Sequence, residues 1–376
     1  MIRSPFESSL VGITGATGFV GMFHLACRQR AGLPTRILVR PQHPWAKAAP
    51  TNVEVAIGDL HDKAQLAAFA QGISACFHYA ARASFRAPWA QLERINIEGT
   101  RNVVEACAQV PRFLMCSTVS TMIRRHDMHD VDESLLPIDG NPDAYGRSKA
   151  KAERLTLAAH AGAVVVRPPW VWGPGDTNNL PTVLRPAMKG MYRMVDHGKR
   201  RGEQLHVSTF IRENEALVCT EASRGNTYFA TDKEARTFAS FAGLLLRAAG
   251  LPMVERSIPG WVVPILHRLD APLFRGKLRL SPATAVLARY EQTFSDRALR
   301  TLVGDLEVMS DGEFETELGA WLTAMGGAAR VVRGRKQGAD EVLVQNIWTW
   351  LTEHSESVRR VASGMSNAAI PGKMLG

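Results

Sequence analysis

Long apolar runs are missing from this chain of 376 residues. A helix that crosses a membrane needs about 18 or more apolar residues in a row, so we expect no membrane-spanning helix. The first nine residues are too polar for an export signal, which favours a cytoplasmic protein. Hydrophobic residues still make up 45% of the chain, as in an ordinary globular enzyme with a large core.

Cysteine is scarce. The chain has five cysteines, and none of them is spaced like a metal ligand: Cys27, Cys76, Cys107, Cys116 and Cys219. An odd number of cysteines without an export signal favours a reducing cytoplasm. We therefore expect no metal site.

Acidic residues are outnumbered, and the formal net charge is +9. Basic residues cluster at 197–201 and 330–336, but aromatic residues are not interleaved with them as stacking on nucleic acid requires. We therefore expect a solvated basic surface and no specific nucleic-acid partner. Such a surface would attract anionic dinucleotides, coenzyme A-like substrates or anionic lipid headgroups.

Glycine is concentrated at one informative place. The apolar run 10–14 leads into a turn with Gly15, Gly18 and Gly21 at three-residue intervals, and a helix-like segment follows. In a dinucleotide site the first glycine makes the tight turn and the second admits the pyrophosphate. The third lets helix and strand pack closely, and the helix N-terminus attracts the phosphates. A glycine-rich turn without a ligand is the alternative.

The strands that follow carry candidate cofactor contacts. The second, 35–40, ends on Arg40, where an NAD-binding protein usually has Asp or Glu; Arg suits a 2′-phosphate, so NADP is favoured over NAD. A plain surface charge at Arg40 is the alternative. The third strand ends in Asp59, placed to accept a hydrogen bond from adenine. The fourth ends in Ala80 and Ala81, which leave room for the cofactor near the backbone.

Tyr145 and Lys149 lie four residues apart in a polar, helix-like segment, so they share one helix face. A neighbouring cation favours the phenolate and would lower the tyrosine pKa toward neutrality. Tyr145 could then donate or accept a proton at physiological pH. The alternative is a solvated helix face.

Together these segments resemble an extended short-chain dehydrogenase/reductase of the NAD-dependent epimerase/dehydratase superfamily, over roughly residues 10–235. Further matches are the helix 96–107, the strand 113–120 that ends in hydroxyl residues, and the Arg-Pro-Pro-Trp-Val-Trp-Gly-Pro-Gly-Asp run ending at 176. The closest likeness is to the 3β-hydroxysteroid dehydrogenase-like and dihydroflavonol-reductase-like branch. The chain departs from the family at 204–219, where Ser208 and Thr209 replace the usual acidic or amide residues.

The resemblance implies an α/β fold: a Rossmann-like doubly wound parallel sheet with a smaller, mostly helical C-terminal substrate domain. The NADP-binding domain would span 1–176, with 204–235 returning to it. Residues 177–203 and 236–328 would form the substrate-binding part. Residues 329–376 would form a basic linker and an appended helix at 339–362, which could cap the substrate pocket or pair two subunits into a homodimer. The segment 258–280 would line the substrate mouth, with peripheral membrane contact as the alternative.

The family's catalytic set implies roles for four residues. Tyr145 would be the general acid, Lys149 would tune it and hold the nicotinamide ribose, and Thr118, or else Ser117, would bind the substrate oxygen. The implied cofactor contacts are Gly15, Thr17, Gly18, Phe19, Val20, Arg40, Asp59, Leu60, Ala80, Ala81, Asn96, Lys149 and Pro168.

The implied function is NADP(H)-dependent interconversion of a ketone and a secondary alcohol on a small hydrophobic substrate that is sterol-, polyketide- or β-keto acid-like. A sugar-nucleotide epimerase or dehydratase of the same superfamily is an alternative. A dehydratase needs an acid/base pair directly after the hydroxyl residue, but this chain has Val119 and Ser120 after Thr118. A non-enzymatic NADP-binding regulator is the other alternative, and such proteins dispense with the Tyr-Lys pair.

Overall fold

The computed structural model describes residues 9–138, 140–232, 235–270, 273, 281–306, 308–334 and 341–366. Its central element is a seven-stranded parallel sheet with the strand order β12-β7-β5-β4-β1-β2-β3. The strands of this sheet are β1 (Val11–Thr14), β2 (Thr35–Val39), β3 (Val53–Ile57), β4 (Ala75–His78), β5 (Arg112–Cys116), β7 (Ala163–Arg167) and β12 (Thr227–Phe229). The order reverses between β1 and β4, the place where a doubly wound sheet binds ligands at its carboxyl edge.

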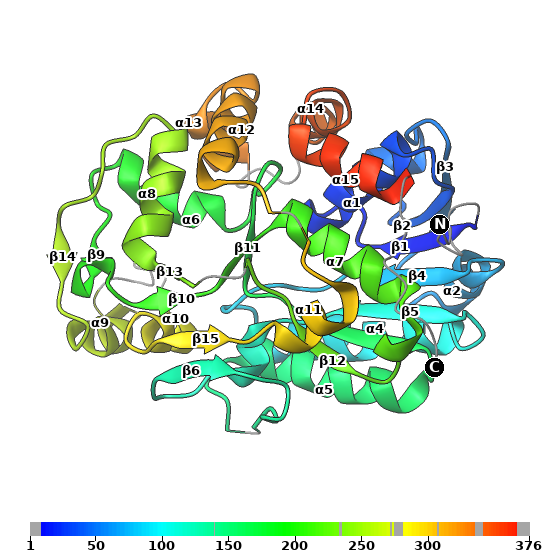
Figure 1. Cartoon of the computed structure of the whole chain (residues 1–376), viewed down its shortest axis with the longest axis horizontal. Coiled ribbons are helices and arrows are strands. Elements are labelled where there is room, and N and C mark those ends of the chain that lie inside the picture. The colour runs from blue at the N-terminus through cyan, green and yellow to red at the C-terminus, as the bar shows by residue number, and fades with distance from the viewer. Residues whose placement is uncertain are drawn as a thin grey trace.

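Helices cover both faces of this sheet (Figure 1). One face carries α1 (Phe19–Arg30) and α7 (Val207–Cys219), and the other carries α2 (Lys63–Ala70), α4 (Gly99–Ala106) and α5 (Ala144–Ala159). Each face of the sheet has its own hydrophobic core, and neighbouring strand residues point alternately into one and the other. Phe77 packs in the core on the α1 side, whereas Cys76 packs in the core on the α4 side. This period of two on a sheet buried on both faces explains why the strands are apolar throughout. The predicted fold class is confirmed.

Most of the remaining elements form a largely helical region, on the left and at the top of Figure 1, with short strands between the helices; α11 (Arg297–Val303) instead contacts α7 and β12 near the centre of the view. The helices of this region are α6 (Leu180–Met188), α8 (Phe238–Ala248), α9 (Val262–Asp270), α10 (Pro282–Leu287), α12 (Asp311–Ala324) and α13 (Ala328–Gly334). Its strands, with β6 from the loop before α5, are β6 (Met128–Val131), β8 (Trp170–Trp172), β9 (Met194–Val195), β10 (Arg201–Gly202), β11 (Gln204–His206), β13 (Arg236–Thr237), β14 (Ser257–Ile258) and β15 (Gln292–Phe294). A short helix, α3 (Trp89–Leu92), and a π-helical turn, Glu93–Glu98, lead into α4.

The end of the chain differs from the single appended helix expected at 339–362. Two helices are present, α14 (Glu341–Glu353) and α15 (Glu356–Ser366), and α13 occupies part of the expected linker. The break falls at Ser355, whose side-chain oxygen accepts a hydrogen bond from the Val358 amide and so starts a new helix. Residues 335–340 and 367–376 lie outside the described residues.

None of the helices in the described part of the chain is long and apolar enough to cross a membrane. Within the segment 258–280, Trp261 is 65% exposed, and residues 271–272 and 274–280 lie outside the described ranges. Peripheral membrane contact through this segment stays a prediction.

Candidate active site

The glycine turn joins β1 to α1 and has the close packing that a dinucleotide site requires. Gly15 has a φ of +74°, and a side-chain carbon there would lie 2.6 Å from the Ala80 backbone nitrogen. A side-chain carbon at Gly21 would lie 2.3 Å from the Gly15 oxygen. Gly18 caps α1 without a side-chain hydrogen bond, and no acidic residue stands in the first helical turn. The turn therefore fits a pyrophosphate at the N-terminus of α1, with Thr17, Phe19 and Val20 beside it.

A buried chain of hydrogen bonds fixes β4 beside this turn. The Thr14 hydroxyl lies 2.7 Å from His78 Nδ1, and the Thr100 hydroxyl lies 3.0 Å from His78 Nε2. Burial, assisted by the charge of Lys149, lowers the pKa of His78 to about 3, so the imidazole is neutral. The sequence analysis missed His78. Its position at the end of a buried apolar strand was the available signal.

The predicted ribose and adenine contacts lie where β2 and β3 end. Arg40 directly follows β2 and is exposed, as is Asp59. Asp59 accepts a hydrogen bond from the His61 amide, and Leu60 packs against Gly99 at the start of α4. Their contacts with a cofactor stay predictions.

Asn96 is fully buried and makes its hydrogen bonds within the protein. Its Oδ1 accepts from the Arg82 amide at 2.7 Å, and its Nδ2 donates to the Ser148 hydroxyl at 2.9 Å. The side chain therefore joins the loop after β4, which contains Ala81, to α5. We expect Asn96 to hold the cofactor loop in place rather than to bind the cofactor directly.

Helix α5 lies tightly against the segment that follows β5. Asp143 caps the helix by accepting hydrogen bonds from the Tyr145 and Gly146 amides at 3.0 and 2.9 Å. A side-chain carbon at Gly146 would lie 2.2 Å from the Ser120 oxygen, so only glycine permits this approach. The side-chain Nδ2 of Asn141 also donates to the Ser120 backbone oxygen, at 2.7 Å. These contacts bring Tyr145 to the end of β5.

Tyr145 is half-buried, and its ring lies 6.1 Å from the exposed Phe85 ring. Burial raises the pKa of the Tyr145 phenol, and the Cys116 thiol and Asp143 raise it further. Lys149 is 1% exposed, and burial lowers the pKa of its amine. The structure thus differs from the expectation that Lys149 brings the Tyr145 pKa toward neutrality, because burial of the phenol is the largest influence on this pKa and raises it.

Ser117 and Thr118 follow β5 and have different partners. The Ser117 hydroxyl donates to Glu153, which forms a buried ion pair with Arg167 through bonds of 3.0 and 2.8 Å. The hydroxyl oxygen of Thr118 accepts a hydrogen bond from the Ser120 backbone amide at 3.1 Å. This bond does not use the hydroxyl proton of Thr118. This arrangement favours Thr118 as the donor to a substrate oxygen.

Glu153 and Arg167 were not predicted from the sequence. Glu153 lies four residues after Lys149 on the same helix face, and this spacing was the signal that it faces the site. Arg167 ends β7, next to the buried Pro168, whose oxygen accepts from the Val119 amide at 3.0 Å. The carboxyl ends of β5 and β7 are therefore fastened together beside Thr118.

The chain is similar to known proteins over most of its length. The sequence model of the 3-beta hydroxysteroid dehydrogenase/isomerase family matches residues 12–259. The chain is 31% identical over 303 residues to a 4-hydroxy-2-methyl-3-oxo-4-farnesyl-3,4-dihydroquinoline-1-oxide ketoreductase from Stigmatella aurantiaca, covering 78% of this chain and 90% of that protein. It is 28% identical over 257 residues to a 2-alkyl-3-oxoalkanoate reductase from Stenotrophomonas maltophilia, covering 65% of this chain and 77% of that protein.

Solved structures show the same fold at lower identity. The structure of gox2253 has a TM-score of 0.70 at 23% identity and covers 85% of this chain and 99% of its own. The structure of MoeE5 in complex with UDP-glucose and NAD has a TM-score of 0.63 at 22% identity and covers 83% of this chain and 97% of its own.

Proposed function

We infer that this chain, which belongs to the 3-beta hydroxysteroid dehydrogenase/isomerase family, is an NADP(H)-dependent oxidoreductase acting on a ketone or secondary alcohol of a hydrophobic substrate. Membership makes it an extended short-chain dehydrogenase/reductase. The cofactor's phosphate and the substrate class are the parts that we propose.

The position of α5 across the end of β5 carries this proposal. Gly146 packs on the Ser120 oxygen and Glu153 binds Ser117, so the helix face with Tyr145 and Lys149 lies against the segment containing Thr118. This packing supports the proposal that Tyr145 and Thr118 act on one substrate oxygen, with Lys149 beside them.

Each side chain then has a defined task. The Tyr145 phenol protonates the substrate oxygen during reduction. The Thr118 hydroxyl donates to the same oxygen as negative charge develops. Lys149 holds the nicotinamide ribose. A bound nicotinamide supplies the hydride that reduces the carbonyl carbon.

The substrate class is inferred from relatives and from the site's edge. Two relatives are named as reductases of a farnesylated dihydroquinoline oxide and of 2-alkyl-3-oxoalkanoates. Both substrates join a ketone to an apolar chain. The exposed Phe85 ring beside Tyr145 offers such a chain an apolar contact at the site.

A sugar-nucleotide epimerase is the second candidate, because structural relatives such as MoeE5 bind UDP-glucose and NAD. Their identity to this chain is low, and Val119 and Ser120 stand where a dehydratase would need its acid/base pair. A non-enzymatic NADP-binding regulator would have no use for Tyr145 and Lys149.

A turnover assay separates these candidates. We expect NADPH oxidation with 2-alkyl-3-oxoalkanoates or ketosteroids, faster than with NADH, and none with UDP-glucose. Conversion of UDP-glucose without net cofactor consumption would support the epimerase. Tight NADPH binding without turnover on any ketone would support the regulator.

A further inference from the structure

The helices α14 and α15 lie beyond the segment matched by the family and pack on the dinucleotide half of the molecule. Both contact α1, the helix that starts at the glycine turn, and α14 and α15 are drawn in red beside it in Figure 1. The Arg30 side chain at the end of α1 donates to the Thr352 oxygen at 2.7 Å. The two roles expected of the appended helix, as a cap on the substrate pocket or as a subunit contact, stay predictions.

One contact of α14 leads to Arg40. The Trp348 ring lies 5.1 Å from the Trp45 ring, edge to face, and both side chains are buried. The Trp45 ring in turn lies 5.3 Å from His43, again edge to face. The His43 amide donates to the Arg40 oxygen at 2.9 Å. Three aromatic rings in sequence therefore support the loop that presents Arg40 after β2.

A second contact leads to the glycine turn. A side-chain carbon at Gly175 would lie 3.4 Å from the Phe19 ring and 3.6 Å from the Ile347 side chain, so both side chains lie beside Gly175 in the same core cluster. Phe19 is the first residue of α1, directly after Gly18. Helix α14 thus contacts the residues that flank both cofactor loops, although it lies far away in sequence.

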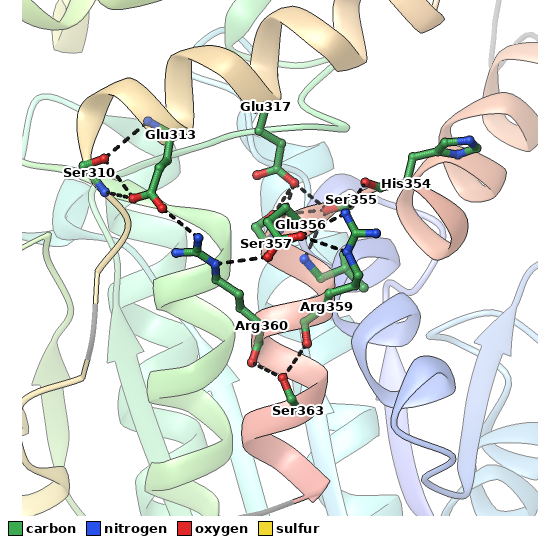
Figure 2. Close-up of polar contacts among 11 residues, drawn as sticks. Ser310, Glu313, Glu317, His354, Ser355, Glu356, Ser357, Arg359, Arg360 and Ser363 are labelled. Atoms are coloured by element: carbon green, nitrogen blue, oxygen red, sulfur yellow. Dashed lines mark hydrogen bonds and ion pairs between the residues drawn. The ribbon is translucent and has the colours of Figure 1, made fainter.

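The junction between α14 and α15 is anchored by a buried carboxylate, as Figure 2 shows. Glu317 of α12 accepts hydrogen bonds from the Ser355 hydroxyl at 2.7 Å and from the Ser357 amide and hydroxyl at 2.9 Å. Arg360 adds a bond of 2.7 Å to Glu313. A carboxylate at the start of α15 is well placed for the helix dipole. The pair is therefore held both to α1 and to α12.

We propose that α14 positions the two loops that hold the dinucleotide, with Trp348 acting through Trp45 on Arg40, so that the C-terminal helices set the affinity for the cofactor. This proposal rests on the dinucleotide site of the proposed function. Trp348 is a positioning residue, because it touches the loop and not the cofactor. A preorganised loop loses less conformational freedom when a ligand binds.

The test compares two tryptophans of the same helix. Trp348→Ala should weaken NADPH binding by roughly three- to thirty-fold, the range for residues that act through neighbours. NADH binding should weaken less, because Arg40 faces the 2′-phosphate. Trp348→Phe should restore most of the affinity. Trp350→Ala is the matched control: Trp350 is equally buried but, two residues along the helix, faces away from Trp45.

Binding is measured by NADPH fluorescence titration without substrate, and the KM for NADPH should change more than kcat. Equal losses in Trp348→Ala and Trp350→Ala, or no loss in Trp348→Ala, would overturn the proposal while leaving the proposed function intact. If Trp348→Ala does not fold, Trp348→Leu keeps apolar volume, removes the ring contact and carries the same expectation. A wild type that binds neither dinucleotide overturns both proposals.

Discussion

Two adjacent hydroxyls after β5 have partners that assign them different tasks. The Ser117 proton is used by Glu153, whereas the Thr118 oxygen accepts from a backbone amide and keeps its proton for a substrate. We expect Thr118→Val to slow turnover by ~10²-fold, the cost of one lost oxyanion donor, and to leave NADPH binding nearly unchanged. Ser117→Ala should retain more activity than Thr118→Val in steady-state assays. The reverse order would exchange the two roles.

The proposed choice of NADP depends on Arg40. It is exposed directly after β2, where a 2′-phosphate would lie. Arg40→Ala should weaken NADPH binding by ~1.5–3 kcal/mol, as expected for a hydrogen bond to a charged group, with little change for NADH. Titration of both cofactors checks this, with Arg36→Ala, whose side chain pairs with Glu54, as the control. Equal losses for both cofactors would show that Arg40 does not bind the phosphate.

At the scale of elements, α5 is fastened to β7 by the buried Glu153–Arg167 pair. Removing one partner leaves the other charge buried without compensation. We expect Glu153→Ala to lower the free energy of unfolding by ~3–5 kcal/mol in urea titrations. Glu54→Ala removes the exposed pair with Arg36 and should cost less than ~1 kcal/mol. Similar losses for the two variants would contradict the assigned role of the buried pair.

The sequence predicts those elements whose patterns are local. The glycine spacing predicts the turn between β1 and α1, and the four-residue spacing of Tyr145 and Lys149 predicts their shared helix face. The contribution of Glu153 to the choice between Ser117 and Thr118 depends on contacts across the fold, which no single segment contains. The break at Ser355 depends likewise on Glu317 of another helix. Strands of two or three residues, such as β10 and β13, are too short to show a period.

At the scale of the whole molecule, buried carboxyls make stability depend on pH. Burial raises the pKa of Glu203 to about 7, and that of Asp232 and Asp143 to about 6. A raised carboxyl pKa means that folding favours the protonated form. This stability is complete below the unfolded pKa of ~4 and is lost as the pH rises through the folded pKa.

Of these three groups Glu203 has the highest pKa, so its contribution to stability should be lost at the highest pH. Between pH 6 and pH 8 we expect the wild type to lose ~1.4 kcal/mol of unfolding free energy through this group, the equivalent of one pKa unit. Glu203→Gln mimics the protonated side chain and should remove that part of the loss. Denaturant titrations at the two pH values measure it. A variant that declines as steeply as the wild type would contradict the raised pKa.

The whole account depends on Tyr145 as the proton donor, and Tyr145→Phe tests it most directly. The substitution removes one hydroxyl and keeps the ring that lies beside Phe85. The variant should therefore fold and bind NADPH like the wild type. Its turnover of any ketone that the wild type reduces should fall by ~10²–10⁴-fold, the usual cost of losing a positioned general acid. A Tyr145→Phe enzyme that keeps full turnover from pH ~6 to ~9 would contradict the mechanism.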